Sequence, residues 1–203
     1  DMLTAAGVDE AALRTYLIEN ELALIVSRDV TQRDVADQQQ PFNLRVVDNA
    51  GDPLGKETGT GNGTQYDVAY MQFFPGRSGS GVVCWKRHTT GWSTRLGPAA
   101  TRGPATAANP TVAGPPGSVA IARDGSVAAF VPTQRALSWQ LTDQDGNAIV
   151  RERYWLTFQP GEIRVCTSCH GANMIDQAGS GPSINQSEAL LQLLQHWQEG
   201  QQK

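Results

Sequence analysis

Hydrophobic and polar positions along this chain alternate mainly with a period of two, the period of a half-buried β-strand. Two Asp-Gly pairs, Asp124-Gly125 and Asp145-Gly146, lie between such runs and predict tight hairpin turns. Short strands separated by turns at this spacing predict an antiparallel β-sandwich. The predicted strands cover residues 22–27, 42–47, 66–74, 119–121, 127–131, 137–141, 148–150 and 154–158.

A helical period appears only near the two ends of the chain. Asp9 is placed to cap a helix that runs through Asn20, with apolar residues on one face. Asn185 and Glu188 form a possible capping box for a second helix that ends at about Glu199. Its apolar face consists of Leu190, Leu193, Leu194 and Trp197. The predicted fold class is therefore mainly β and sandwich-like, with an N-terminal helix, a segment that attaches a cofactor and a C-terminal helix.

The stretches between these elements predict loops. Residues 28–41 are polar, and residues 49–64 are rich in Gly, so both are expected to be irregular. Residues 96–117 are rich in Pro, Gly and Ala and have no period, which predicts a surface crossing between residues 1–95 and residues 118–203. We interpret residues 1–203 as a single domain with these three parts.

Composition narrows the functional classes. The chain has 203 residues, 39% of them hydrophobic, which is enough for a core. Its formal net charge is −4 and it has no basic run, so nucleic acid is not an expected partner. No apolar stretch approaches the roughly 18 residues that a membrane span needs. The first residues lack the features of a signal peptide, so we expect a mature product or a fragment of a longer precursor.

Cys166-Thr167-Ser168-Cys169-His170 is a C-x-x-C-H sequence, which is typical of covalent attachment of one haem c. In such a site, the Cys166 and Cys169 thiols form thioethers with the haem vinyl groups. The His170 imidazole then binds the iron as the proximal ligand. We therefore predict that these three residues bind the cofactor, with His170 as a metal ligand.

Two other chemistries fit the same five residues. A C-x-x-C pair can be a redox dithiol, although such a pair usually follows a strand in a βαβ pattern. It can also be half of a zinc site, with a further ligand from Cys84, His88 or His196. Cys84, the remaining cysteine, lies in an apolar run and is expected to be buried and inert, or else paired with another chain.

The ligand on the other face of the iron decides between functions, because a strong sixth ligand favours electron transfer and an open position favours catalysis or gas binding. Met174 is four residues after His170, so on a helix it would lie on the proximal side of the haem. The distal candidates, none of which the sequence selects, are His88, His196, Met71, Cys84, Tyr66 and Tyr70.

Apolar residues near the motif are candidates for the wall of a haem pocket, where they would exclude water and set the reduction potential. They are Val165, Met174, Leu190, Leu194 and Trp197. An aromatic set is expected to build the sheet core and part of this wall. It consists of Trp139, Tyr154, Trp155 and Phe158.

Several stretches resemble a known family. They are Gln39 to Val46, Asp124 to Ser126, Leu137 to Asp143, and Pro160 to Gly171, where the chain is expected to leave the sheet just before the motif. Together they resemble the haem-bearing domain of hydrazine synthase alpha-subunit-like proteins, a group of exported c-type cytochromes. The resemblance implies a β-sandwich-like domain with haem on Cys166, Cys169 and His170.

We therefore expect an exported monohaem c-type cytochrome, periplasmic or extracellular, that transfers single electrons. Its expected partner is a redox protein or another haem subunit of a larger assembly, and an oligomer is possible. The first alternative is a haem enzyme with an open distal site, as the resemblance implies. The second is a haem-bearing assembly or filament module, for which a Cys84–Cys84 bridge between chains would be a sign.

Overall fold

Strand β1 (Leu22–Ser27) is the central strand of the sheet that positions the motif. It pairs in parallel with β10 (Ile163–Cys166) and antiparallel with β7 (Val127–Pro132). The computed structural model describes residues 2–36, 41, 43–76, 108–167 and 174–201. Both faces of β1 are covered, which explains why its sequence is continuously apolar rather than alternating.

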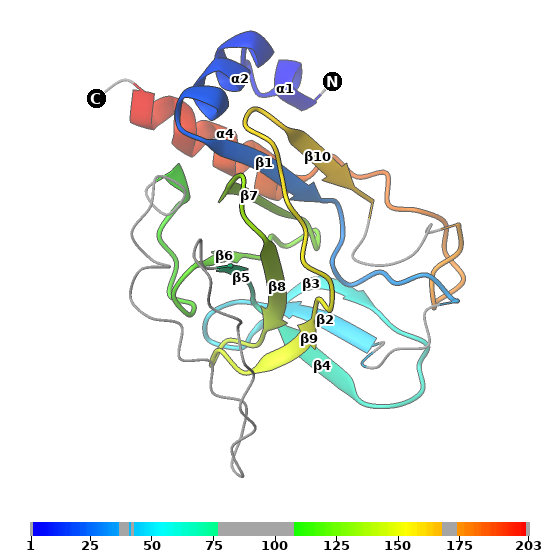
Figure 1. Ribbon diagram of the computed structural model, residues 1–203. Helices are drawn as coiled ribbons and strands as arrows, with labels where there is room; N and C mark the ends of the chain where they lie inside the picture. The colour runs from blue at the N-terminus through cyan, green and yellow to red at the C-terminus, as the bar shows by residue number, and fades with distance from the viewer. Residues whose placement is uncertain (1, 37–40, 42, 77–107, 168–173, 202–203) are drawn as a thin grey trace.

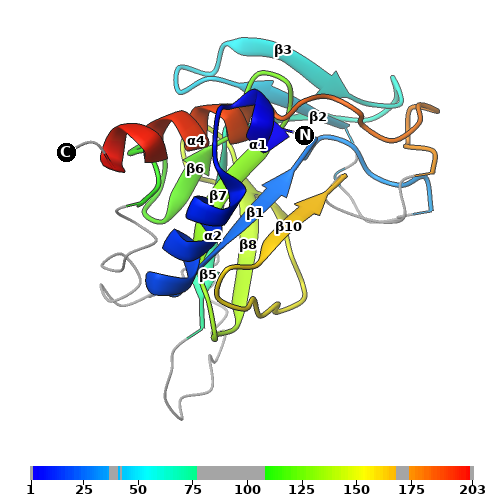
Figure 2. The ribbon, with the colours of Figure 1, turned by 90° about the horizontal axis from the view of Figure 1, so that it is seen from above.

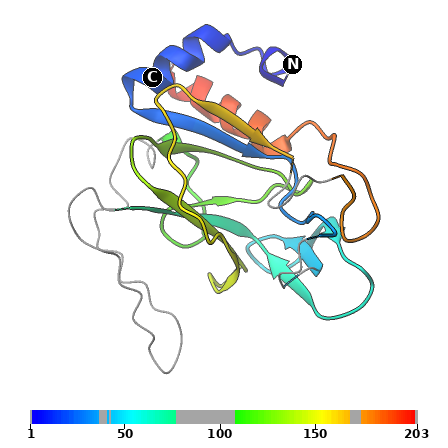
Figure 3. The same cartoon turned by 45° about the vertical axis from the view of Figure 1, so that its right-hand side comes forward.

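Two further sheets lie on the other side of β1 and β7 from the helices (Figures 1 and 3). One has the order β3-β2-β4 and contains a parallel pair, β2 with β4. The other is antiparallel and has the order β6-β5-β8-β9. Their strands are β2 (Asn43–Val47), β3 (Pro53–Thr58), β4 (Gln65–Val68), β5 (Tyr70–Pro75), β6 (Ser118–Ala120), β8 (Leu137–Thr142) and β9 (Ala148–Arg151).

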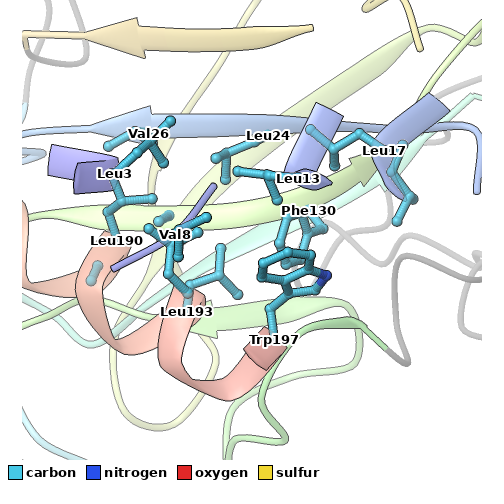
Figure 4. Close-up of a cluster of buried hydrophobic side chains, with 14 of the residues drawn as sticks. Leu3, Val8, Leu13, Leu17, Leu24, Val26, Phe130, Leu190, Leu193 and Trp197 are labelled. Carbon is cyan, nitrogen blue, oxygen red and sulfur yellow. The ribbon is translucent and has the colours of Figure 1, made fainter. Parts of the chain in front are cut away.

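The helices form the outer layer on the first sheet, as the view from above shows (Figure 2). They are α1 (Met2–Ala5), α2 (Glu10–Glu19) and α4 (Glu188–Gln201). Their apolar side chains meet those of β1 and β7 in what we call the helix-side core, which includes Leu13, Leu24, Phe130, Leu193 and Trp197 (Figure 4). The opposite face of β1 and β7 packs on the other two sheets and forms the inter-sheet core.

The predicted helices are present, and α2 is capped as expected, since Asp9 accepts a hydrogen bond of 2.8 Å from Ala11 N. The capping box predicted for α4 is wrong. The side chain of Ser187, directly before the helix, accepts from Leu190 N at 3.1 Å. Asn185 instead donates to Asp124 Oδ2, which also accepts from Glu188 N. A distant carboxylate therefore takes part in capping α4, which a local sequence pattern cannot show.

Two predictions for the first half of the chain need correction. The segment 66–74 is not one strand but two, because β4 and β5 are separated at Ala69 and belong to different sheets. The segment 49–64 is not all loop, since it contains β3. This strand is exposed along most of its length and pairs with β2 across a bulge, so it lacks the apolar signal that identifies a buried strand.

The two Asp-Gly turns have different outcomes. Asp145-Gly146 joins β8 to β9 in the expected hairpin. Asp124-Gly125 also forms a tight turn, closed by a hydrogen bond of 2.9 Å from Ala122 N to Ser126 O. Its flanking strands separate, however, because β6 pairs with β5 while β7 pairs with β1. The prediction of a hairpin between them is therefore wrong, although the turn is correct.

The end of the β region also differs from the prediction. Residues 154–158 form no strand and contribute only an isolated bridge between Leu156 and Leu137. After the turn at Gly161, the chain does not run directly into the motif but first forms β10, which joins the sheet of β1 and β7. The mainly β class with helices near both ends is confirmed. Within the described ranges, none of the helices combines the length and apolar character required to cross a bilayer.

Candidate functional site

The C-x-x-C-H sequence begins inside the first sheet. Cys166 is the last residue of β10 and lies opposite Ser27, the last residue of β1. The backbone amide of Arg28, the residue directly after β1, donates a hydrogen bond of 3.0 Å to Cys166 O. Cys169 and His170 lie outside the described residues. The first thiol of the motif is therefore held by a parallel strand pair, a position that the sequence did not predict.

After the motif, the described chain packs against the loop that continues β1. Val35 N donates to Ile175 O at 3.0 Å, and Gln177 N donates to Arg33 O at 3.0 Å. An isolated antiparallel bridge joins Asp34 to Asp176 between these two bonds. The described residues on the two sides of the motif, Cys166 and 175–177, thus lie against the end of β1 and against residues 33–35 of the loop that follows it.

We call the buried contacts between residues 29–33 and residues 176–183 the polar clamp. Gln32 Nε2 donates to Asp176 Oδ2 at 2.9 Å and to Gly181 O at 3.2 Å, and its Oε1 accepts from Ser183 Oγ at 2.8 Å. Gln177 Nε2 donates to Thr31 O at 3.1 Å. The predicted loop character of residues 28–41 is right for the described part. Its burial is unexpected for so polar a sequence, and these bonds explain it.

Asp29 anchors the inner side of the clamp. Its Oδ1 accepts from Thr31 N at 2.9 Å and from Thr31 Oγ1 at 2.7 Å. Its Oδ2 forms an ion pair of 2.8 Å with Lys56 Nζ of β3, and its side chain is 1% exposed. A buried carboxylate needs such partners because desolvation disfavours its charge. The site-bearing loop is therefore tied to the second sheet as well as to β1.

Four exposed apolar side chains lie on the described flanks of the motif or on the loop bonded to its second flank, and we call them the apolar rim. Val165 precedes Cys166, Met174 and Ile175 follow the motif, and Val35 is hydrogen-bonded through its backbone to Ile175. Their exposed fractions lie between 46% and 74%. Val35 and Ile175 are brought together by this backbone bond, and adjoining exposed apolar side chains are typical of a surface that contacts a partner.

The Cys166 side chain is exposed and forms no disulfide with any described residue. Partial desolvation raises the pKa of its thiol, while the Arg164 guanidinium acts in the opposite direction and lowers it. Reactive dithiols have instead a lowered pKa on the attacking cysteine. The direction of the shift at Cys166 is therefore opposite to that of the attacking cysteine of a redox dithiol.

The structure separates the residues predicted to line a haem. Val165 and Met174 belong to the apolar rim, as a wall would require. Leu190, Leu194 and Trp197 do not, because they are buried in the helix-side core on α4. Of the aromatic set, Phe158 and Trp139 lie in or against the inter-sheet core, whereas Tyr154 and Trp155 are exposed and belong to no core.

The distal candidates are dispersed. Met71 is buried in the inter-sheet core, Tyr70 is buried beside Val47, and Tyr66 is partly exposed on β4. His196 is exposed on α4. His88 and Cys84 lie outside the described residues. None of the described candidates forms a hydrogen bond with a residue of the apolar rim. The identity of the sixth ligand stays a prediction.

Sequence reasoning missed Val35, Ile175 and the polar clamp. One signal was present, since Asp29 followed two residues later by Thr31 is a pattern in which Asp bonds the local backbone.

Among the described residues, no three His, Cys, Asp or Glu side chains gather as a possible metal site.

Comparison with known proteins gives one family match. Residues 81–171 match the model of the hydrazine synthase alpha subunit middle domain, and this range includes all three motif residues. A solved structure, Kuenenia stuttgartiensis hydrazine synthase, is similar at 13% identity and a TM-score of 0.43 over 84% of this chain. The chain spans about a fifth of that relative, 20% of its length. No curated protein matches the chain.

Proposed function

We propose that this chain is an exported c-type cytochrome domain with one covalent haem c, which transfers single electrons within a multi-subunit redox assembly. The observation that carries the proposal is the position of Cys166. Its exposed side chain stands at the end of β10, next to Val165 of the apolar rim, and the chain beyond the motif is bonded to the continuation of β1, the strand that pairs with β10. These features fit a large flat apolar group fixed at one edge.

The residues have separate roles in this proposal. Cys166 and Cys169 hold the haem through thioethers, and His170 binds the iron, which changes its charge by one electron. Val35, Val165, Met174 and Ile175 cover part of the ring and exclude water, which tunes the reduction potential. The polar clamp fixes the segment that follows the motif, so that the iron ligand keeps its orientation when the charge of the iron changes.

The multi-subunit context is supported by the match to a family named as an alpha subunit. The expected partners are another haem subunit or a soluble redox protein. The periplasmic or extracellular location follows from the haem chemistry, since attachment to C-x-x-C-H takes place outside the bacterial cytoplasm. The chain's own exposed rim is the surface at which its haem would approach a partner.

A second candidate is a haem enzyme, and the same family match favours it because the family is named for a synthase. In this alternative the distal position of the iron is open or weakly held. The two candidates share the haem and the three motif residues. They differ only in the occupancy of the sixth coordination position.

The test is to export the chain in a host with haem c maturation, and then record its mass and its absorption spectrum. Covalent haem and a Soret band are expected in the wild type. Both should be lost when Cys166 and Cys169 are replaced together by serine. Cys84→Ser is the matched control, since it removes a thiol outside the motif and should retain the haem. A wild type without haem would refute the proposal.

Carbon monoxide added to the dithionite-reduced protein separates the two candidates. Low-spin bands that the gas does not change indicate two strong axial ligands and support electron transfer. A high-spin spectrum that shifts on addition of the gas indicates an open iron and supports the enzyme. Substitution of His88, His196 or Met71 in a low-spin protein then identifies the distal ligand by the appearance of a high-spin spectrum.

A further inference from the structure

We propose that the Arg164 guanidinium, held in place by Glu162 and Phe158, raises the reduction potential of the haem. The proposal rests on the proposed function and deepens it, because it assigns a residue of this chain to the control of electron transfer at the same site. Arg164 and Cys166 are two residues apart on β10. Side chains at that spacing lie on one face of a sheet, so the guanidinium is on the same side as the thiol that would hold the haem.

The neighbours of Arg164 identify this face of β10. Arg164 lies opposite Ile25 in the β1/β10 register, and Ile25 packs against the inter-sheet core. The guanidinium carbon of Arg164 lies 4.7 Å from the ring centroid of Phe158, which belongs to the same core. Ile163, one residue earlier, packs instead against the helix-side core. Arg164 and Cys166 therefore face the side of the first sheet on which the other two sheets lie.

Two contacts fix the position of the guanidinium. Arg164 Nη2 forms an ion pair of 2.6 Å with Glu162 Oε1, and Glu162 Oε2 accepts a hydrogen bond of 2.9 Å from Gln159 N. The face of the Phe158 ring attracts the cation, and this ring is itself 1% exposed. The charge of Arg164 is thus attached to a buried ring and to a carboxylate that the preceding turn holds. A charge with a fixed position acts constantly on the groups beside it.

The ion pair is ordered along the strand, with the cation nearer the motif. Glu162, Arg164 and Cys166 occupy alternate positions, and Arg164 is the middle one. Among the described groups, Arg164 is the charge that shifts the pKa of the Cys166 thiol, and it lowers this pKa. The positive end of the pair is therefore the end that acts at the first attachment point of the haem.

The same charge acts on a haem bonded to Cys166 Sγ. When the iron takes one electron from a redox partner, Fe³⁺ becomes Fe²⁺ and the net charge of the haem falls by one. A fixed cation nearby stabilises the less positive state relative to the more positive one. Arg164 should therefore favour the reduced haem, while Glu162 cancels part of this effect. The pair would set the potential at which the chain passes on its electron.

The experiment measures the ratio of reduced to oxidised haem at a fixed applied potential in the haem-loaded protein. Arg164→Gln removes the cation and leaves the Glu162 carboxylate uncompensated, so the ratio should fall by about fivefold. Glu162→Gln removes the carboxylate and leaves the cation uncompensated, so the ratio should rise by about threefold. Both substitutions break the same ion pair, so a merely structural role would not give shifts of opposite sign.

Three further variants serve as controls. Arg164→Lys keeps the charge and should stay closer to the wild type than Arg164→Gln. Arg135→Gln and Glu19→Gln each remove one exposed charge near the start of β1, at the other end of that strand from Cys166, and should leave the ratio unchanged.

The outcomes separate the two proposals. If Arg164→Gln does not retain haem, the rise expected in Glu162→Gln decides alone. Haem-loaded variants of Arg164 and Glu162 whose ratios equal those of the Arg135 and Glu19 controls would overturn the inference and leave the proposed function intact. Shifts of the same sign in both would also overturn it. A wild type without haem would overturn both proposals.

Discussion

The side-chain amide of Gln32 donates a buried hydrogen bond of 2.9 Å to the carboxylate of Asp176, a residue 144 positions further along the chain. The bond joins the loop after β1 to the loop after the C-x-x-C-H motif. Since the motif itself begins at β10, beside the end of β1, both of its flanks depend on one short segment. Removing a member of the polar clamp should therefore affect the stability and the geometry of the site together.

Replacement of Asp176 by alanine tests this dependence. Asp176 Oδ1 accepts from Ala178 N at 2.9 Å and from Ser180 N at 2.7 Å, while Oδ2 accepts from Gln32. The variant leaves these donors unsatisfied in a buried place, so we expect the free energy of unfolding to fall by about 3 kcal/mol. Urea denaturation measures the change.

Asp143→Ala is the matched control for this substitution. Asp143 also accepts three hydrogen bonds, two from the amides of Asp145 and Asn147 and one from the Asn147 side chain, but in an exposed turn. Water can replace these bonds, so the expected loss is about 1 kcal/mol. Equal losses in the two variants would show that the burial of the clamp contributes nothing.

The ion pair between Lys56 and Asp29 gives a second prediction. Lys56→Met removes the cation and leaves the fully buried carboxylate with only its hydrogen bonds to Thr31 and Ser183. Because Lys56 is about one-third exposed, part of the charge effect is screened, and we expect a loss of about 2 kcal/mol. Glu10→Ala breaks the exposed pair with Arg14 and should cost about 0.5 kcal/mol. The free energy of unfolding of each variant, measured by a thermal or urea transition, shows whether its ion pair stabilises the fold.

Much of the fold could be predicted from periodicity, because the strands that build the cores carry a clear apolar signal. Strands β1 and β8 and helices α2 and α4 are of this kind. Strand β3 was missed because it is exposed along most of its length and contains a glycine. The prediction that β6 pairs with β7 was wrong, because an Asp-Gly turn specifies only a local reversal of the chain. Which strands pair depends on which distant strands bury the neighbouring side chains.

The site was predicted only in part for a similar reason. The motif identified Cys166 as a candidate, but its place beside Ser27 follows from a parallel pairing between segments far apart in the sequence. Leu194 and Trp197, which we expected at a haem wall, lie in the helix-side core, because an apolar helix face indicates burial without indicating the partner. The contribution of Val35 to the apolar rim could not be foreseen, since a single apolar residue in a polar run has no periodic signal.

The turn at Gly125 yields a third prediction, on the backbone that supports the clamp. Gly125 has φ +82°, and a Cβ placed there would be 2.5 Å from Asp29 Oδ1. Gly125→Ala combines strain at positive φ with displacement of the buried Asp29, so the free energy of unfolding should fall by about 3 kcal/mol. The measurement is again a urea transition.

Gly61→Ala separates the two causes. Gly61 has a similar φ of +76°, but a Cβ there would have no neighbour within 4 Å. Its substitution should cost only the strain of the left-handed conformation, about 1 kcal/mol. If both alanine variants lost the same stability, the close approach of Gly125 to Asp29 would have no energetic consequence.

The thiol of Cys166 gives a prediction on pH dependence in the chain produced without haem. Desolvation raises its pKa and Arg164 lowers it, and desolvation is the larger effect. A smaller fraction of the thiol is then ionised at neutral pH than in an ordinary cysteine, whose pKa is about 8.5. Alkylation of Cys166 by iodoacetamide, followed by peptide mass spectrometry, should be slower than that of a free thiol. Its rate should continue to rise above the pH at which the free thiol has reached its plateau.

Arg164→Gln tests the opposing charge at the same thiol. The variant removes the cation and also releases Glu162, its partner at 2.6 Å, so both changes should raise the pKa of Cys166 further. Alkylation at pH 8 should therefore slow further, by about threefold. Arg164→Lys retains the charge and should keep a rate near that of the wild type, while Arg135→Gln controls for net charge. Faster alkylation in Arg164→Gln would contradict the assigned direction, because it would mean that Arg164 restricts access to the thiol more than it stabilises the thiolate.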